Sequence, residues 1–274
     1  RLVTAPIEVP LPDPIELQKL RSFFWHPVRS FFKDRLNVVV PTSGDEQPTE
    51  LPTALSHLDR SALERAMVEA LVEHPEAPLP PEATEVVDGI VTAASARGVL
   101  PPAHAAADEL AAVFAEAGAM VELAERAGVR SVADQSFPID VVLAPGVRIV
   151  GTVAGCVGGD LPGPVRLRGS RMSASMRLEA VLDLLCLTAQ HPERRWTGVV
   201  VARNPDSKQA DPVVFRVQVR GGNEDERSVV ARSALLALVA QYHDGLRLPL
   251  PLFAKTSWAV FKGSGAKSVW ETFS

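Results

Sequence analysis

The sequence has little cysteine, no net positive charge and no long apolar run, and each absence excludes a class of protein. Its two cysteines, Cys156 and Cys186, lack Cys-x-x-Cys spacing, so neither a cysteine-rich zinc site nor a disulfide framework is expected. Two cysteines allow one disulfide, but we expect both thiols to be reduced in a cytoplasmic protein. The net charge of −5 means that any contact with DNA must come from a local basic patch.

Other common functional signals are also missing. No stretch of 18 apolar residues occurs, so no membrane span is expected, and the first residues do not follow the pattern of a signal peptide. The chain begins with Arg1, which favours a processed product or part of a longer chain. No Walker motif and no HxxH or HExxH spacing is present, so we expect neither an ATP site nor a histidine metal site.

The overall amino-acid composition is that of a globular protein. Apolar residues make up 46% and charged residues 22% of 274 residues, which suits one large domain. We expect a single unit over residues 1–274, with a mainly helical part at 1–128 and a mixed sheet at 129–274. The boundary lies where the apolar period changes from that of helices to that of strands.

Helices dominate the first half and strands the second. A first helix is predicted at 15–36, with a break near His26 caused by Pro27, and a second runs from a cap at Asp59 or Ser61 to residue 73. Further helices are predicted at 82–97, 103–127, 176–189 and 225–243, and Ser175 is the expected cap of the helix at 176–189. Strands are predicted at 136–144, 147–157, 164–169, 196–203 and 213–219. We expect the last helix to stop at Asp244-Gly245, hairpin turns at Gly158-Gly159 and Gly221-Gly222, and irregular structure or a short strand over 250–274.

This order of three strands, a helix and a further strand is similar to that of restriction-endonuclease-like nucleases of the PD-(D/E)XK type. Their second and third core strands supply carboxylates that hold Mg²⁺, followed by a lysine. Here the second strand has Ala154 where an Asp is expected, and the third has Arg166 and Arg168 in place of Asp-x-Lys. The expected fold is therefore an α/β mixed sheet with an added N-terminal helical region and lost catalytic residues, and with no metal site.

One stretch still matches Asp-x-Lys, at Asp206 to Lys208. It lies between two prolines in a polar segment that predicts a turn, whereas a catalytic pair belongs on a rigid strand. We therefore expect no metal there.

Four arginines form a local positive cluster, and these are the candidates for contact with DNA: Arg166, Arg168, Arg171 and Arg177. Arg166 and Arg168 lie on the same face of their strand, and we favour their filling the vacated metal position, paired with Glu179 or Asp183. Arg171 and Arg177 are expected to be exposed.

The stretch FFWHPVRSFF is dense in aromatic rings for a chain with one Tyr and four Trp. It can be a buried anchor, a partner interface or a surface on which bases stack, and we favour a buried helix pair that docks the helical half onto the sheet. The anchor residues are Phe23, Phe24, Trp25, His26, Pro27, Phe31 and Phe32.

Three blocks of the sequence resemble the C-terminal domain of the RecC family, the gamma subunit of exodeoxyribonuclease V. The first carries an HPV-R-x-FF-x-x-RL core, which is met at His26, Pro27, Val28, Arg29, Phe31, Phe32, Arg35 and Leu36. The others are VRLRGSRMSASMRLEAVLDLLCLTA and YHDGLRLPLPLFAKTSW, which starts at Tyr242. Related AddB-type nucleases hold an iron–sulfur cluster through a Cys-Pro-Phe at the matching place, but here the place is His26-Pro27-Val28, so no cofactor is implied.

The resemblance implies a non-catalytic, nuclease-like domain that works with RecB, RecD and DNA in the repair of double-strand breaks by homologous recombination. It would scaffold the complex and help to guide DNA. Two alternatives stay open: an active metal-dependent nuclease of the same fold, and a protein-interaction domain without DNA contact.

Overall fold

The computed structural model describes residues 6–38, 54–74, 79, 81–101, 103–129, 135–158, 162–207, 211–250, 254–261 and 263. The helices are α1 (Leu17–Trp25), α2 (Pro27–Leu36), α3 (His57–Glu73), α4 (Pro81–Ala96), α5 (Ala103–Arg126), α6 (Ala174–Gln190), α7 (Glu224–Arg247) and α8 (Ala254–Phe261). The strands are β1 (Ile15–Glu16), β2 (Gln135–Ala144), β3 (Val147–Val157), β4 (Gly163–Arg171), β5 (Thr197–Arg203) and β6 (Pro212–Gln218). No helix in these ranges is long and apolar enough to cross a membrane.

The helix break at His26 forms as predicted, but the ends of several helices differ from expectation. Ser56 rather than Asp59 or Ser61 caps α3, and Ser173 rather than Ser175 caps α6. A helix, α8, occupies 254–261, where irregular structure or a strand was expected. The pair Gly221-Gly222 connects β6 to α7 instead of forming a hairpin, and part of the expected Gly158-Gly159 turn lies outside the described residues.

The helix α7 continues through Gly245, so the predicted stop there is wrong. Gly245 is buried, and a Cβ atom at this position would overlap the ring of Phe23. The missing side chain therefore serves close helix packing and not a turn. Phe23 in turn meets Tyr242 edge to face, with ring centroids 5.2 Å apart.

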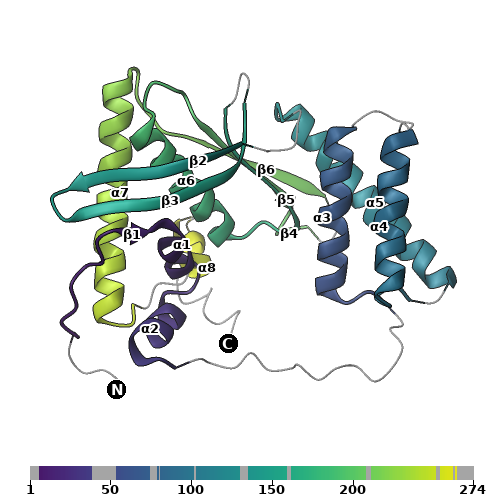
Figure 1. Cartoon of the computed structure of the whole chain (residues 1–274), viewed down its shortest axis with the longest axis horizontal. Helices are drawn as coiled ribbons and strands as arrows, with labels where there is room; N and C mark the ends of the chain where they lie inside the picture. The colour runs from purple at the N-terminus through teal and green to yellow at the C-terminus, as the bar shows by residue number, and fades with distance from the viewer. Residues whose placement is uncertain are drawn as a thin grey trace.

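The strands form one mixed sheet with the expected alternation of directions (Figure 1). The hairpin β2–β3 and the pair β3–β4 are antiparallel, β4 and β5 are parallel and joined by α6, and β5 and β6 are antiparallel. A parallel pair needs such a crossover, which is why a helix separates β4 from β5. The short β1 adds to β3 in parallel, just before α1.

Alternation along β5 assigns the two faces of this part of the sheet. Val199 and Val201 pack in a cluster with Ala124 of α5, whereas Val200 and Ala202 pack with Ala180 of α6. Since Arg166 and Arg168 pair in register with Val200 and Ala202, they lie in the row that faces α6.

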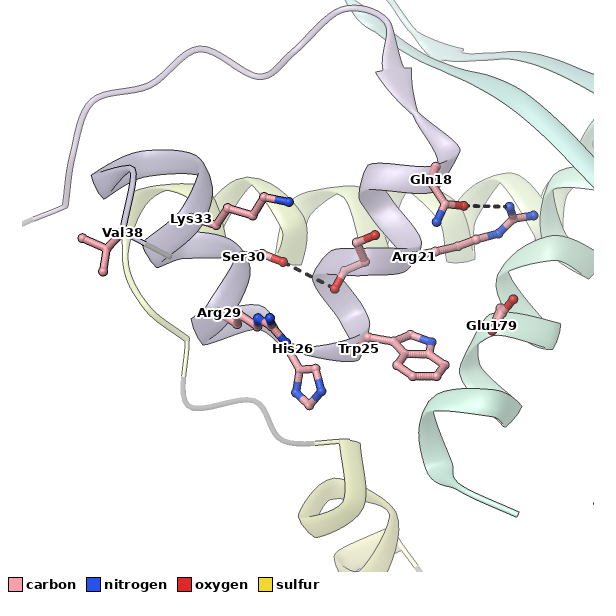
Figure 2. Close-up of a pocket in the computed structure, with 10 residues that line it drawn as sticks. Gln18, Arg21, Trp25, His26, Arg29, Ser30, Lys33, Val38 and Glu179 are labelled. Atoms are coloured by element: carbon pink, nitrogen blue, oxygen red, sulfur yellow. Dashed lines mark hydrogen bonds between the residues drawn. The ribbon is translucent and has the colours of Figure 1, made fainter. Parts of the chain in front are cut away.

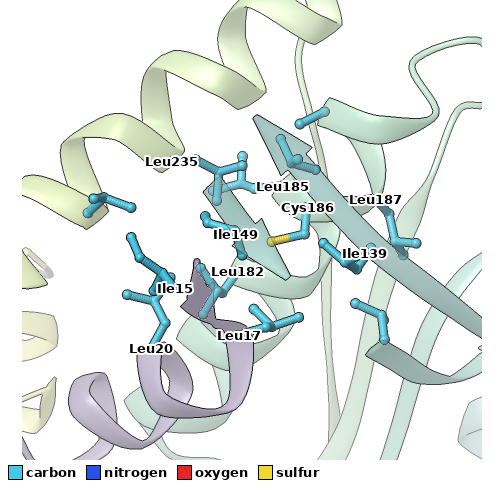
Figure 3. Close-up of a cluster of buried hydrophobic side chains, with 14 of the residues drawn as sticks. Ile15, Leu17, Leu20, Ile139, Ile149, Leu182, Leu185, Cys186, Leu187 and Leu235 are labelled. Carbon is cyan, nitrogen blue, oxygen red and sulfur yellow. The ribbon is translucent and has the colours of Figure 1, made fainter. Parts of the chain in front are cut away.

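The largest core lies between β2–β3 and the helices α1, α6 and α7 (Figure 3). Leu17 and Leu20 of α1 meet Leu182 of α6 and Leu235 of α7 there, and all four are almost completely buried. The free thiol of Cys186 lies inside the same core, and burial raises its pKa. The helix α1 thus shares a core with the sheet although it comes from the helical first part of the chain, and α2 packs against α1 and α7.

The helices α3, α4 and α5 form a second cluster of their own at the opposite end of the sheet from α7 (Figure 1). A polar bridge joins this group to the sheet: Glu64 of α3 accepts a hydrogen bond of 2.8 Å from Arg203 of β5, which also pairs with Glu116 of α5. Glu64 is buried, which raises its pKa, and the Arg203 guanidinium offsets part of that rise. A Cβ atom at Gly169 of β4 would overlap the Glu64 carboxylate, so this bridge requires glycine there.

The packing of α7 against α1 gives a prediction for two glycine-to-alanine variants. Gly245→Ala should lower the free energy of unfolding by about 1–3 kcal/mol, because the Phe23 ring must move within a close-packed core. Gly89→Ala in α4, where nothing lies within 4 Å of the new methyl group, should raise it by about 0.5–1 kcal/mol. Urea unfolding measures both, and a Gly245→Ala variant as stable as Gly89→Ala would contradict this packing.

Candidate functional site

The three residues that the sequence predicts in place of metal ligands come together in the structure. Ala154 of β3 and Arg166 and Arg168 of β4 line one open cavity of about 400 Å³. Arg65 and Glu69 of α3 and Glu179 of α6 also line it. Ala154 is exposed and both β4 arginines are half-buried, so the cavity has a basic floor that solvent reaches.

Behind this cavity a buried carboxylate holds two arginines. The side chain of Asp183, on α6, is 0% exposed, and it pairs with Arg21 of α1 and Arg166 of β4. Arg21 donates through Nε at 2.8 Å and also through a terminal nitrogen, while Arg166 donates at 3.0 Å. We name these three residues the Asp183 triad.

Other donors of the triad bind backbone carbonyls of the strands and one side chain. Arg166 donates to the carbonyls of Gly155 and Val165 at 3.3 and 3.0 Å, and Arg21 donates to that of Thr152 at 3.3 Å and to the side chain of Gln18 at 3.4 Å. Burial raises the pKa of Asp183, and the two guanidiniums offset part of that rise. The triad thus provides the buried carboxylate with two cations and fixes α1, β3, β4 and α6 to one another.

The four arginines proposed for DNA contact fall into different environments. Arg166 belongs to the triad through Asp183, one of the two partners considered for it. Arg168 forms no ion pair among the described residues and lines the cavity, and Arg171 is exposed at the end of β4. Arg177 differs from the expectation of exposure: its guanidinium lies 4.4 Å from the centroid of Trp258, and burial lowers its pKa.

The aromatic segment is divided between core and surface. Phe23, Phe24 and Phe31 are buried, as the anchor interpretation requires, but Trp25 is 42% exposed and His26 also lies at the surface. The buried rings dock α1 and α2 against α7 and the sheet rather than holding α3–α5. The anchor prediction is therefore wrong for Trp25 and His26, which lie at the surface. It is also wrong about what is docked, because the segment attaches itself to the sheet and α7 and does not attach α3–α5.

The residues that the structure describes include no group of three or more His, Cys, Asp or Glu side chains suited to a metal ion. Asp206, the acid of the isolated Asp-x-Lys match, is exposed in the turn after β5, where its N–H donates to the side chain of Asn204. Lys208 lies outside the described residues.

Sequence reasoning missed Arg21 of the triad and Glu64 of the polar bridge. The signal in each case is a charge on an apolar helix stripe. Arg21 falls at helical spacing from Leu17 and Phe24, and Glu64 at helical spacing from Met67 and Leu71. A charge on such a stripe requires a buried partner.

The triad predicts a strong effect on stability when its carboxylate is removed. Asp183→Ala should lower the free energy of unfolding by about 3–5 kcal/mol, because it leaves two partly buried guanidiniums without their partner. The matched control is Asp140→Ala, which breaks the exposed pair with Arg148 and should change the unfolding midpoint little. Equal shifts for the two variants in urea unfolding would show that the triad does not hold the elements together.

Comparison with known proteins agrees with the sequence blocks. The family of RecC C-terminal domains matches residues 12–265. RecBCD enzyme subunit RecC of Mycolicibacterium smegmatis is 29% identical over 93% of this chain and 21% of its own length, and that of Mycobacterium tuberculosis is 28% identical over 98% and 23%. The chain therefore spans about a fifth of the length of these relatives.

Two further comparisons are shorter or weaker. RecBCD enzyme subunit RecC of Escherichia coli is 38% identical over 26% of this chain and 6% of its own length. A solved structure from Eubacterium rectale, provisionally named an exonuclease, covers 85% of this chain and 82% of its own with a TM-score of 0.39 and 9% identity, which is too distant to support a conclusion. The match over residues 12–265 is sufficient by itself: the chain belongs to the family of RecC C-terminal domains.

Proposed function

We propose that this chain is a catalytically inert domain of the PD-(D/E)XK type, which scaffolds a RecBCD-type complex with RecB and RecD and helps to guide DNA during the repair of double-strand breaks. The observation that carries the proposal is the content of the cavity between β3, β4, α3 and α6. On the strands from which a nuclease directs carboxylates at Mg²⁺, this cavity presents Ala154, Arg166 and Arg168, and its two acids come from α3 and α6.

The chemistry of these side chains opposes metal-dependent cleavage. Mg²⁺ binds oxygen ligands, above all carboxylates, and guanidiniums repel it. The nearest carboxylate behind the strands, Asp183, is buried and occupied by Arg21 and Arg166. The arginines of the cavity can attract a phosphate backbone, and its two carboxylates, Glu69 and Glu179, lie on helices and not on the strands that hold the metal in a nuclease of this type.

The same charges support a structural role beside DNA. Arg168 and Arg171 remain available at the end of β4, and a strand of DNA that passes there would meet two guanidiniums without a competing ion pair among the described residues. Contacts of this kind position a backbone without reading its sequence.

A cleavage assay tests the inert site. The chain is incubated with end-labelled single- and double-stranded DNA in Mg²⁺ or Mn²⁺, and we expect no cleavage above that of a metal-free control. Cleavage that depends on the divalent ion and is lost in Asp206→Ala would contradict the proposal and establish an active nuclease.

A separate assembly assay tests the scaffolding role. The chain, joined to the remainder of its subunit, is expected to co-purify with RecB and RecD, and Asp183→Ala is expected to reduce the recovered complex because the domain is destabilised. Full recovery of the complex from a subunit that lacks this domain would refute the scaffolding role.

A further inference from the structure

A second cavity lies beside the first, at the junction of α1 and α2, and the proposed function has not used it. Its volume is about 450 Å³, and we call it the Trp25 groove. The side chains that matter for its chemistry are Arg21, Trp25, His26, Arg29, Lys33 and Glu179. Figure 2 shows Trp25, His26 and Arg29 along one edge of the junction, Lys33 further along α2, and Glu179 on the neighbouring helix.

The groove combines an exposed ring with cations in a chain of net negative charge. Trp25 is 42% exposed, and Arg29 and Lys33 are exposed and form no ion pair among the described residues. The acid in the lining is Glu179. An indole face flanked by cations that lack partners is the arrangement with which proteins hold single-stranded nucleic acid, because bases stack on the ring and phosphates pair with the charges.

The junction also fixes the backbone that carries the ring. Trp25 ends α1 and Arg29 lies in the first turn of α2, and the hydroxyl of Ser30 donates across the junction to the carbonyl of Ser22 at 3.4 Å. Phe23 and Phe31, on the two helices, are buried. The helices on both sides of Trp25 are therefore anchored in the fold, so binding of a base need not order the backbone there.

The two cavities border each other. Glu179 lines both, so the two cavities adjoin at this side chain. Basic side chains line both of them, from α2 to β4, and the second cavity also carries Glu69.

We propose that the Trp25 groove binds single-stranded DNA, with one base stacked on Trp25 and phosphates paired with Arg29 and Lys33. The inference rests on the proposed function as a DNA-path element and adds the contact surface and the form of DNA. A base in a duplex is already stacked and paired, so the indole selects a strand whose bases are free.

The test separates the base from the phosphate. Binding of the chain to a fluorescein-labelled oligothymidylate and to an abasic strand of equal length is followed by anisotropy at several salt concentrations. We expect tighter binding of the oligothymidylate. Trp25→Ala should weaken oligothymidylate binding by about 5- to 100-fold and leave the abasic strand unaffected, while Trp25→Phe should retain most of the affinity.

The contribution of Arg29 and Lys33 is tested by the salt dependence of binding. Arg29→Ala and Lys33→Ala should weaken both strands alike, and each should reduce the slope of log affinity against log salt by about 0.7. Glu179→Gln should strengthen binding, because it removes the carboxylate from the path. The matched control Glu125→Gln changes the same charge on an exposed residue of α5 outside both cavities and should have no effect.

Several results would contradict the proposal that the Trp25 groove binds single-stranded DNA. These are equal binding of the two strands by the unaltered chain, no binding of either strand, or an unchanged oligothymidylate affinity in Trp25→Ala. Loss of assembly with RecB and RecD in Trp25→Ala, without loss of DNA binding, would assign the groove to a protein partner instead. Assembly, cleavage and DNA binding are measured separately. A groove that does not bind DNA therefore leaves the scaffolding proposal intact, and a chain that does not assemble with RecB and RecD can still be tested for DNA binding.

Discussion

The carboxylate of Asp183 is the constraint around which the domain is built. A fully buried anion needs charge partners, and its partners come from α1 and β4, which are far from α6 in sequence. Satisfying this one group therefore brings the N-terminal helix onto the sheet and fixes the crossover helix against the strand before it. The apolar core of Leu17, Leu182 and Leu235 then closes around an arrangement that the ion pairs have oriented.

The same constraint determines what the neighbouring surface offers. Arg166 turns inward to Asp183, and Arg168, two residues on, lines the open cavity with Ala154. In our proposal a position that would bind a cation in an active nuclease has become one that favours anions. The buried phenylalanines of α1 and α2 anchor the two helices whose junction exposes Trp25 beside this surface. A structural core and a DNA path can thus arise from the same two helices.

Much of the fold followed from local sequence. Apolar periods located the helices and strands, Pro27 located the break between α1 and α2, and the strand order gave the directions of pairing. Local signals failed where distant packing decided the outcome. Gly245 has the sequence of a helix stop, yet its lack of a side chain admits Phe23. For the site, the residues Ala154, Arg166 and Arg168 could be singled out from the sequence, and the structure places them on one cavity. The exposure of Trp25 could not be predicted, because helical spacing does not show which rings of FFWHPVRSFF the neighbouring helices cover.

The most direct measurement is a crystal structure of the chain soaked in Mn²⁺, with data collected for anomalous scattering. If the cavity of Ala154, Arg166 and Arg168 is an inert nuclease position, its guanidiniums repel the ion, and no anomalous peak will appear there while Asp183 remains bound to Arg21 and Arg166. A peak in this cavity with protein oxygen ligands would contradict the inert site and make the domain a metal enzyme.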